Sequence, residues 1–169
     1  MNRRNPPRTP TNPTPTDPAD PQLIIKLHQL HLKQRGENRP ELFINTQLNQ
    51  AAQKHAEWMA RNNKMSHTGE NRSSFWDRII IEGYNPKTGG ENVAYGCSTA
   101  EEVVQGWMNS SGHRANILNT TWTEVGYGVA GNNSKYWCTV FAKPQQNNEV
   151  RILSAPNDII EPGPLQKQE

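Results

Sequence analysis

The chain has 169 residues, of which 18 are basic and 16 are acidic, and its formal net charge is +2. This length suits one domain with its own core, and so balanced a charge argues against nucleic acid or an anionic membrane surface as the partner. No run of hydrophobic residues exceeds three, which is far too short to span a membrane.

The first 21 residues hold seven prolines and four threonines. Proline at this density favours an extended polyproline II chain, so residues 1–20 are predicted to form a disordered linker. The segment has the basic start of a signal peptide but lacks the apolar run of about 7–15 residues that should follow, so no signal peptide is visible.

The folded part is expected to begin at Asp20 and Pro21, because aspartate is a good N-cap and proline suits the first helical position. Leucines at helical spacing continue this helix to Gly36, where glycine favours a helix end. Three further helices are predicted over residues 45–62, over residues 73–83, and after the capping box of Thr99 and Glu102.

The character of the chain changes after Asn119. Residues 124–130 and 135–142 resemble strands, and the turn-forming sequence at 131–134 joins them into a predicted hairpin. A last short strand is predicted at 150–153, followed by a loose tail. Helices first and strands last indicate an α+β domain in which helices cover an antiparallel sheet.

Three polar segments carry the residues with chemical potential: His67 in MSHTGEN, Glu91 in GGENVAYG and His113 in SGHRANIL. We expect each of them in a loop or at the end of an element, where functional sites usually lie. Each residue alone is more typical of a cap, a core residue or an acceptor for backbone amides. The two histidines are far apart in the sequence, so no local spacing rule predicts that they lie together.

Together, the segments SHTG, GGENVAYG, EEVVQGWMNSSGHRANILN, TEVGYGV and YWCTVFA resemble the bacterial, SCP-like branch of the CAP superfamily (cysteine-rich secretory protein, antigen 5 and pathogenesis-related 1). The resemblance runs from about residue 22 to 143. It implies a three-layer αβα sandwich with an antiparallel sheet between helical layers. It places the CAP domain at residues 21–145, leaves 146–169 as a C-terminal strand or loose tail, and implies an extracellular or cell-envelope location.

The resemblance also implies a cleft in which two histidines and two glutamates converge. His67, Glu91 and His113 match three of these four residues, and Ser110 stands where animal and plant relatives have the second glutamate. Three nearby carboxylates are candidates for the missing one: Glu70, Glu102 and Glu124. Glu102 also suits its capping box, and Glu124 also suits a pair with Arg114.

Two neutral imidazoles and a carboxylate suit zinc or another divalent cation, with open positions for water. Glu91 can serve as a ligand or as the acceptor that orients one imidazole. If the protein is an enzyme, the same three residues, His67, Glu91 and His113, are the catalytic candidates. A serine nucleophile is not favoured, because no serine lies in a nucleophile elbow.

Three function classes stay open. The resemblance favours a monomeric binding module for a small hydrophobic ligand, a cell-envelope glycan or a protein, with possible zinc. The alternatives are a metal-assisted hydrolase of peptides or cell-wall material, and a structural or interaction domain.

Several further residues are given structural roles by default. Trp58, Trp76, Trp107, Trp122 and Trp137 are predicted to be core residues. His55 lies on an apolar helical stripe and is predicted to be structural, whereas His28 and His31 have no obvious partner. Cys97 and Cys138 can form one bridge or remain thiols, and the sequence leaves both possibilities open.

Overall fold

The computed structural model describes residues 20–146. The predicted linker therefore lies outside the described residues except for Asp20, and the predicted strand at 150–153 and the C-terminal tail lie outside them entirely. No helix within residues 20–146 is both long enough and apolar enough to cross a membrane.

The described chain has all of its helices before its last two strands. The helices are α1 (Pro21–Arg35), α2 (Thr46–Arg61), the 3-10 turn η1 (Glu70–Arg72), α3 (Phe75–Ile81), α4 (Ala100–Met108) and α5 (Ser111–Leu118). The strands are β1 (Phe43–Ile44), β2 (Pro86–Tyr95), β3 (Glu124–Ala130) and β4 (Tyr136–Pro144).

The predicted helix boundaries are confirmed by their caps. The side chain of Asp20 accepts a hydrogen bond from the backbone of Gln22 at the start of α1, and Gly36 ends that helix with φ at 67°. Thr99 and Glu102 form the predicted capping box of α4. Each cap satisfies backbone groups that a helix end would otherwise leave unpaired.

The four strands form one sheet in the order β1-β3-β4-β2. The predicted hairpin of β3 and β4 is confirmed, and β2 pairs antiparallel with β4. The expectation of a purely antiparallel sheet is wrong at one edge, because β1 pairs parallel with β3. Two residues of β1 are too few to show the alternation that identifies a strand in a sequence.

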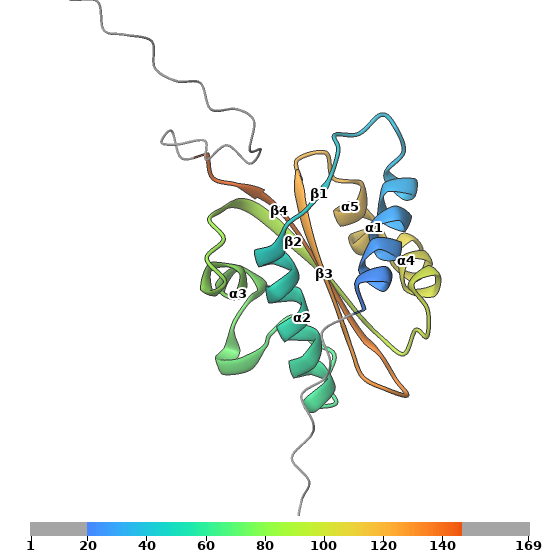
Figure 1. The fold of residues 1–169 in the computed structure, drawn as a ribbon, viewed down its shortest axis with the longest axis vertical. Coiled ribbons are helices and arrows are strands. Elements are labelled where there is room, and N and C mark those ends of the chain that lie inside the picture. Colours follow the sequence, from blue (N-terminus) through green and yellow to red (C-terminus); the bar gives the residue numbers. More distant parts are fainter. Residues whose placement is uncertain (1–19, 147–169) are drawn as a thin grey trace, which may run out of the picture.

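The sheet lies between two helical layers, which confirms the three-layer αβα sandwich. Figure 1 shows α2 and α3 on one face and α1, α4 and α5 on the other. Helix α2 approaches β3 closely because Gly126 and Gly128 have no side chain: a Cβ atom on either would lie 2.1–2.4 Å from backbone atoms of Leu48 or Ala52. Each face of the sheet packs against its helices through a separate apolar core.

The tryptophan prediction holds for three residues and fails for two. Trp107, Trp122 and Trp137 are buried, whereas Trp58 and Trp76 are only half-buried. Both exceptions belong to the thinner layer of α2 and α3, where each helix has one side open to solvent.

Both cysteines are free thiols. Cys97 packs against the core on the side of α1 and α4, whereas Cys138 belongs to the core beneath α2. The sheet separates the two sulfur atoms, so a bridge would need the backbone to be rebuilt.

We therefore expect two alkyl groups to be added when the protein is unfolded without reductant and treated with an alkylating reagent. Intact-mass spectrometry measures this number directly. A chain that takes up no alkyl group until it is reduced would contradict the fold described for Cys97 and Cys138.

Candidate functional site

Glu91 forms the centre of the candidate site. It lies in the middle of β2, and its side chain is only 1% exposed. Its Oε1 accepts a hydrogen bond from Nδ1 of His67 at 2.9 Å, and its Oε2 accepts one from Nη2 of Arg78 at 2.5 Å. The thiol of Cys138 also points at Oε2, with the sulfur at 3.5 Å. Both carboxylate oxygens are thus engaged inside the protein.

The surroundings of Glu91 keep it ionised. Burial alone raises the pKa of this carboxyl, but the hydrogen bond from His67 and the charge of Arg78 outweigh burial and hold the pKa below its usual value. The hydrogen bond to Glu91 in turn raises the pKa of His67. Because a carboxylate only accepts, Nδ1 of His67 must carry the proton and Nε2 points away with its lone pair free.

Arg78 is the most important residue that sequence reasoning missed. It projects from α3, and besides Glu91 its Nη1 donates to the backbone oxygens of His67 at 3.2 Å and Ser73 at 2.8 Å. It therefore holds the loop before α3 in place as well as neutralising Glu91. Its signal in the sequence is weak: a charged residue stands beside three isoleucines, of which Ile79 is buried and Ile80 and Ile81 are exposed.

The expectation that Glu91 lies in a loop or at the end of an element is wrong. It lies inside β2, a strand that was not predicted because Gly89, Gly90, Glu91 and Asn92 all have low strand propensity. Tertiary contact explains the strand: a Cβ atom at Gly89 would lie 2.9 Å from the backbone oxygen of Phe141 on β4, so only glycine fits there.

His113 lies in α5, a short helix that was also not predicted as a separate element. Its Nδ1 lies 2.9 Å from Oγ of Ser110, the residue that replaces the second glutamate. Burial lowers the pKa of His113, and the charge of the nearby His67 lowers it further. When Nδ1 donates to Ser110, the lone pair of Nε2 is free, as it is in His67.

Two buried asparagine contacts connect these histidine-bearing segments. The amide of Asn92, which is fully buried on β2, donates to the backbone oxygen of His113 at 3.1 Å. Asn116 of α5 donates to the backbone oxygen of Glu91 at 3.2 Å and to the side chain of Asn92 at 2.8 Å. Both asparagines lie in the two distinctive motifs, GENVAYG and GHRANIL, yet sequence reasoning gave them no role.

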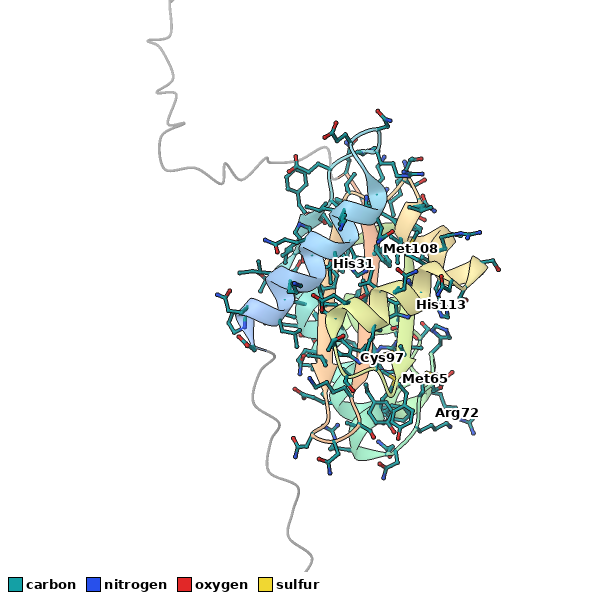
Figure 2. All side chains as sticks on the ribbon, turned by 90° about the vertical axis from the view of Figure 1, so that its right-hand side faces the viewer. His31, Met65, Arg72, Cys97, Met108 and His113 are labelled. Carbon is teal, nitrogen blue, oxygen red and sulfur yellow. The ribbon has the colours of Figure 1, made fainter. Side chains whose placement is uncertain are left out.

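The site opens to solvent through a polar cleft. Its volume is about 370 Å³, and its lining consists of His67, Thr68, Arg72, Ser74, Phe75 and Glu91. His113 is not part of this lining, so the structure brings His67 and Glu91 into contact and connects His113 through Asn92. Figure 2 shows His113 and Arg72 along the same edge of the molecule.

The three candidates for the missing carboxylate are engaged or placed elsewhere. Glu102 serves its capping box, as expected. The expected pair of Glu124 with Arg114 is wrong, because the hydroxyl of Tyr84 donates to Glu124 at 2.5 Å. Glu70 is exposed in η1 and lines a separate cavity between α2 and α3.

The remaining histidines are structural. Nε2 of His55 donates to the backbone oxygen of Ser66 at 2.7 Å, which supports the loop that carries His67. His28 and His31 do have partners, contrary to expectation: Nδ1 of His28 lies 3.1 Å from the Tyr127 hydroxyl, and Nδ1 of His31 donates to the Leu27 oxygen at 2.8 Å.

The nitrogen and oxygen donors of the site decide how it could hold a divalent cation. Within residues 20–146, no three histidine, cysteine, aspartate or glutamate side chains gather as a ready ligand set. Glu91 has no free oxygen for a cation, but its contact with His67 matches the way a carboxylate orients a metal-binding imidazole. Among the described residues, His67 and His113 each keep one ring nitrogen without a hydrogen-bond partner.

Comparisons with known proteins support the resemblance read from the sequence. The model of the cysteine-rich secretory protein family (CAP) matches residues 27–141. Protein YkwD of Bacillus subtilis (strain 168) is 40% identical over 93 residues, which are 55% of this chain and 36% of YkwD.

Solved structures share the fold. An extracellular protein containing an SCP domain from Bacillus anthracis str. Ames superimposes with a TM-score of 0.69 at 27% identity, over 80% of this chain and 45% of that one. The structure of NaASP2 with Zn²⁺ superimposes with a TM-score of 0.53 at 15% identity, over 75% of this chain and 82% of that one. The chain thus spans less than half the length of both Bacillus relatives.

Proposed function

Because the chain belongs to the bacterial branch of the CAP (cysteine-rich secretory protein) family, we propose that its domain is a monomeric binding module at the cell envelope or outside the cell. Its cleft receives a polar ligand, a glycan or a protein segment. Its two free imidazoles, those of His67 and His113, hold a divalent cation, preferably zinc. The proposal concerns the domain, since the Bacillus relatives are more than twice as long.

One observation carries the proposal. Both oxygens of Glu91 are engaged, while Nε2 of His67 and Nε2 of His113 have no partner within residues 20–146. Groups that only hold the fold together are normally paired. In this cluster, the buried carboxylate of Glu91 is fully paired, whereas the outward nitrogens of His67 and His113 are not. This arrangement is expected of a rigid site that binds a ligand.

The lining of the cleft combines apolar surface with several hydrogen-bonding side chains. Phe75 is its one large apolar side chain, beside Arg72, Ser74 and Thr68. The cleft suits a glycan or a protein segment that combines hydrogen-bonding groups with an apolar face.

The same geometry argues against a hydrolase. A metal-assisted hydrolase that uses a carboxylate as its base needs that carboxylate free to take a proton from an attacking water. Glu91 accepts hydrogen bonds from His67 and Arg78, and Ser110 replaces the second glutamate, so no carboxylate of the described site is free to act as that base.

Zinc fits the proposal as a ligand of the two imidazoles. His67 and His113 would hold it, and Glu91 would keep the His67 ring in the correct tautomer. When bound, zinc supplies positive charge for an oxygen of the ligand. NaASP2, which shares the fold, has been solved with Zn²⁺.

We expect calorimetric titration at about pH 7.5 to show weak zinc binding, because two nitrogen ligands with no carboxylate make a low-affinity site. His67→Ala and His113→Ala should each lose most of the binding. His28→Ala, which changes a half-buried histidine of α1 whose ring contacts Tyr127, is the matched control and should bind like the parent. Binding that survives unchanged in both cleft variants would overturn the zinc assignment.

The pH dependence of zinc binding has a definite sign. A protonated imidazole cannot bind a metal, and the pKa of His67 is raised by its hydrogen bond to Glu91. Affinity should therefore begin to fall at a higher pH than for an ordinary histidine as the solution is acidified. NMR titration of the two imidazoles should show His67 titrating above His113, and the reverse order would contradict the Glu91 contact.

A further inference from the structure

A third cavity lies at the C-terminal end of β2. Its volume is about 310 Å³, and it is enclosed by the C-terminal end of α2, the last residue of β2 and the tip of the β3–β4 hairpin. Figure 1 shows the lower end of α2 and this hairpin tip at the same end of the molecule. The cavity shares no lining residue with the cleft of His67.

An aromatic ring forms one wall. Tyr95 is 51% exposed, although it ends a strand, and it pairs across the sheet with the buried Tyr136. The two ring centroids are 4.6 Å apart, with 38° between the ring planes. The buried ring supports the exposed one, so Tyr95 presents a fixed apolar surface at little cost in side-chain entropy.

Uncharged polar side chains form the other walls. Asn63 comes from the end of α2, and Asn132, Asn133 and Ser134 come from the hairpin tip. None of these four side chains makes a hydrogen bond to another residue within 20–146, and the three hairpin residues and Asn63 are exposed. Each amide offers two donors and an acceptor, so the cavity carries a set of unused partners for hydroxyl groups.

Turn formation does not explain the asparagines that line this cavity. An asparagine that serves a turn bonds its own nearby backbone, and these side chains do not. The hairpin tip is shaped instead by Gly131, whose φ is +105° and whose Cβ, if present, would lie 2.3 Å from the Ser134 oxygen. Asn63 belongs to a different element and holds a φ of +48° beside the hairpin.

This cavity differs from the other two in the charge of its lining residues. The cleft contains Arg72 and Glu91, and the cavity between α2 and α3 contains several charges of both signs. No charged side chain lines the cavity at the hairpin. Its ligand should therefore be neutral, polar and flat enough to pack against an aromatic ring.

We propose that this cavity is a binding site for a neutral sugar unit of a glycan. One face of a pyranose ring carries C–H groups and packs against an aromatic ring, here Tyr95, while its hydroxyl or acetamido groups bond amides, here those of Asn63 and Asn133. The site rests on its own residues and does not depend on the function proposed for the cleft.

The test is an NMR titration of the full chain, labelled with ¹⁵N, with two soluble neutral oligosaccharides, chitotetraose and cellotetraose. We expect at least one of them to shift the amide signals of Tyr95, Asn63 and the hairpin tip. Tyr95→Ala should weaken this binding about tenfold or more, as truncation of a central aromatic contact commonly does. Asn133→Ala, on an exposed loop, should weaken it less without altering the fold.

Two controls separate this site from general effects. Phe43→Ala removes another exposed aromatic ring, 56% exposed on the far edge strand, and should leave sugar binding unchanged. Tyr95→Ala should leave zinc binding unchanged, because Tyr95 does not line the cleft of His67. The proposal is overturned if neither sugar shifts these signals, or if Tyr95→Ala and Asn133→Ala, both still folded, bind the sugar as the parent does.

Discussion

Replacing Glu91 by glutamine is expected to lower the free energy of unfolding by about 3–5 kcal/mol, the range found when one partner of a buried ion pair is removed. The change keeps the shape of the side chain and removes its charge. Arg78, whose side chain is only 10% exposed, would then hold a positive charge with no counter-charge in contact. His67 would also lose its carboxylate, and its pKa should fall toward the ordinary value.

Chemical denaturation of the parent and of Glu91→Gln measures this effect. Glu101→Gln is a suitable control, because Glu101 pairs with Lys26 on the surface, and exposed pairs contribute little. The double variant Arg78→Met, Glu91→Gln should recover part of the loss, since the unpaired charge is gone. Equal losses for Glu91→Gln and Glu101→Gln would show that the Arg78–Glu91 pair does not stabilise the domain.

Local signals in the sequence were sufficient to predict α1, α2, α3 and α4, but not α5. Asp20, Ser74 and Thr99 cap their helices through side-chain contacts that span at most three residues, so a reader of the sequence can recognise them. The same holds for the hairpin, whose turn chemistry at 131–134 lies between two apolar strands. The αβα sandwich itself came from the family resemblance rather than from these patterns.

Contacts between distant residues could not be read in the same way. Strand β2 contains two glycines, a glutamate and an asparagine in sequence, and it is a strand because β4 pairs with it along its whole length. Arg78 lies 13 residues from Glu91 and in a different element, so no spacing rule connects the two. The candidate histidines were found through the resemblance, but the residues that orient them required the tertiary structure.

The second large effect is expected on acidification, at His31 in the core between α1 and the sheet. Its ring is fully buried and lies 5.0–5.9 Å, centroid to centroid, from the rings of Trp107, Tyr127 and Phe141. Burial is the main cause that lowers the pKa of His31 to about 4, and the neighbouring His28 and Arg35 add to it.

The hydrogen bonds of His31 explain why its protonation is unfavourable. Nδ1 already donates to the Leu27 oxygen, and Nε2 has no partner within residues 20–146. A proton added to Nε2 would create a charged donor in an aromatic core with nothing in contact to accept from it. The folded domain therefore requires the neutral ring.

The sign of the pH effect follows from the direction of this shift. The unfolded chain takes up a proton on His31 near pH 6.5, whereas the folded chain resists until about pH 4. The stability that depends on the neutral ring is thus complete above pH 6.5 and is lost as the pH falls toward 4. The total loss should be about 3 kcal/mol, at about 1.4 kcal/mol for each unit of pKa difference.

Denaturation curves recorded across this range, for the parent and for His31→Leu, test the assignment. Leucine fills much of the same space and cannot titrate, so the variant should keep most of its stability between pH 6.5 and 4. His28→Gln changes a half-buried histidine of the same helix, and it should reduce the pH dependence by less, because His28 retains contact with solvent. If His31→Leu loses stability on acidification as steeply as the parent, the buried imidazole is not the source of the acid sensitivity.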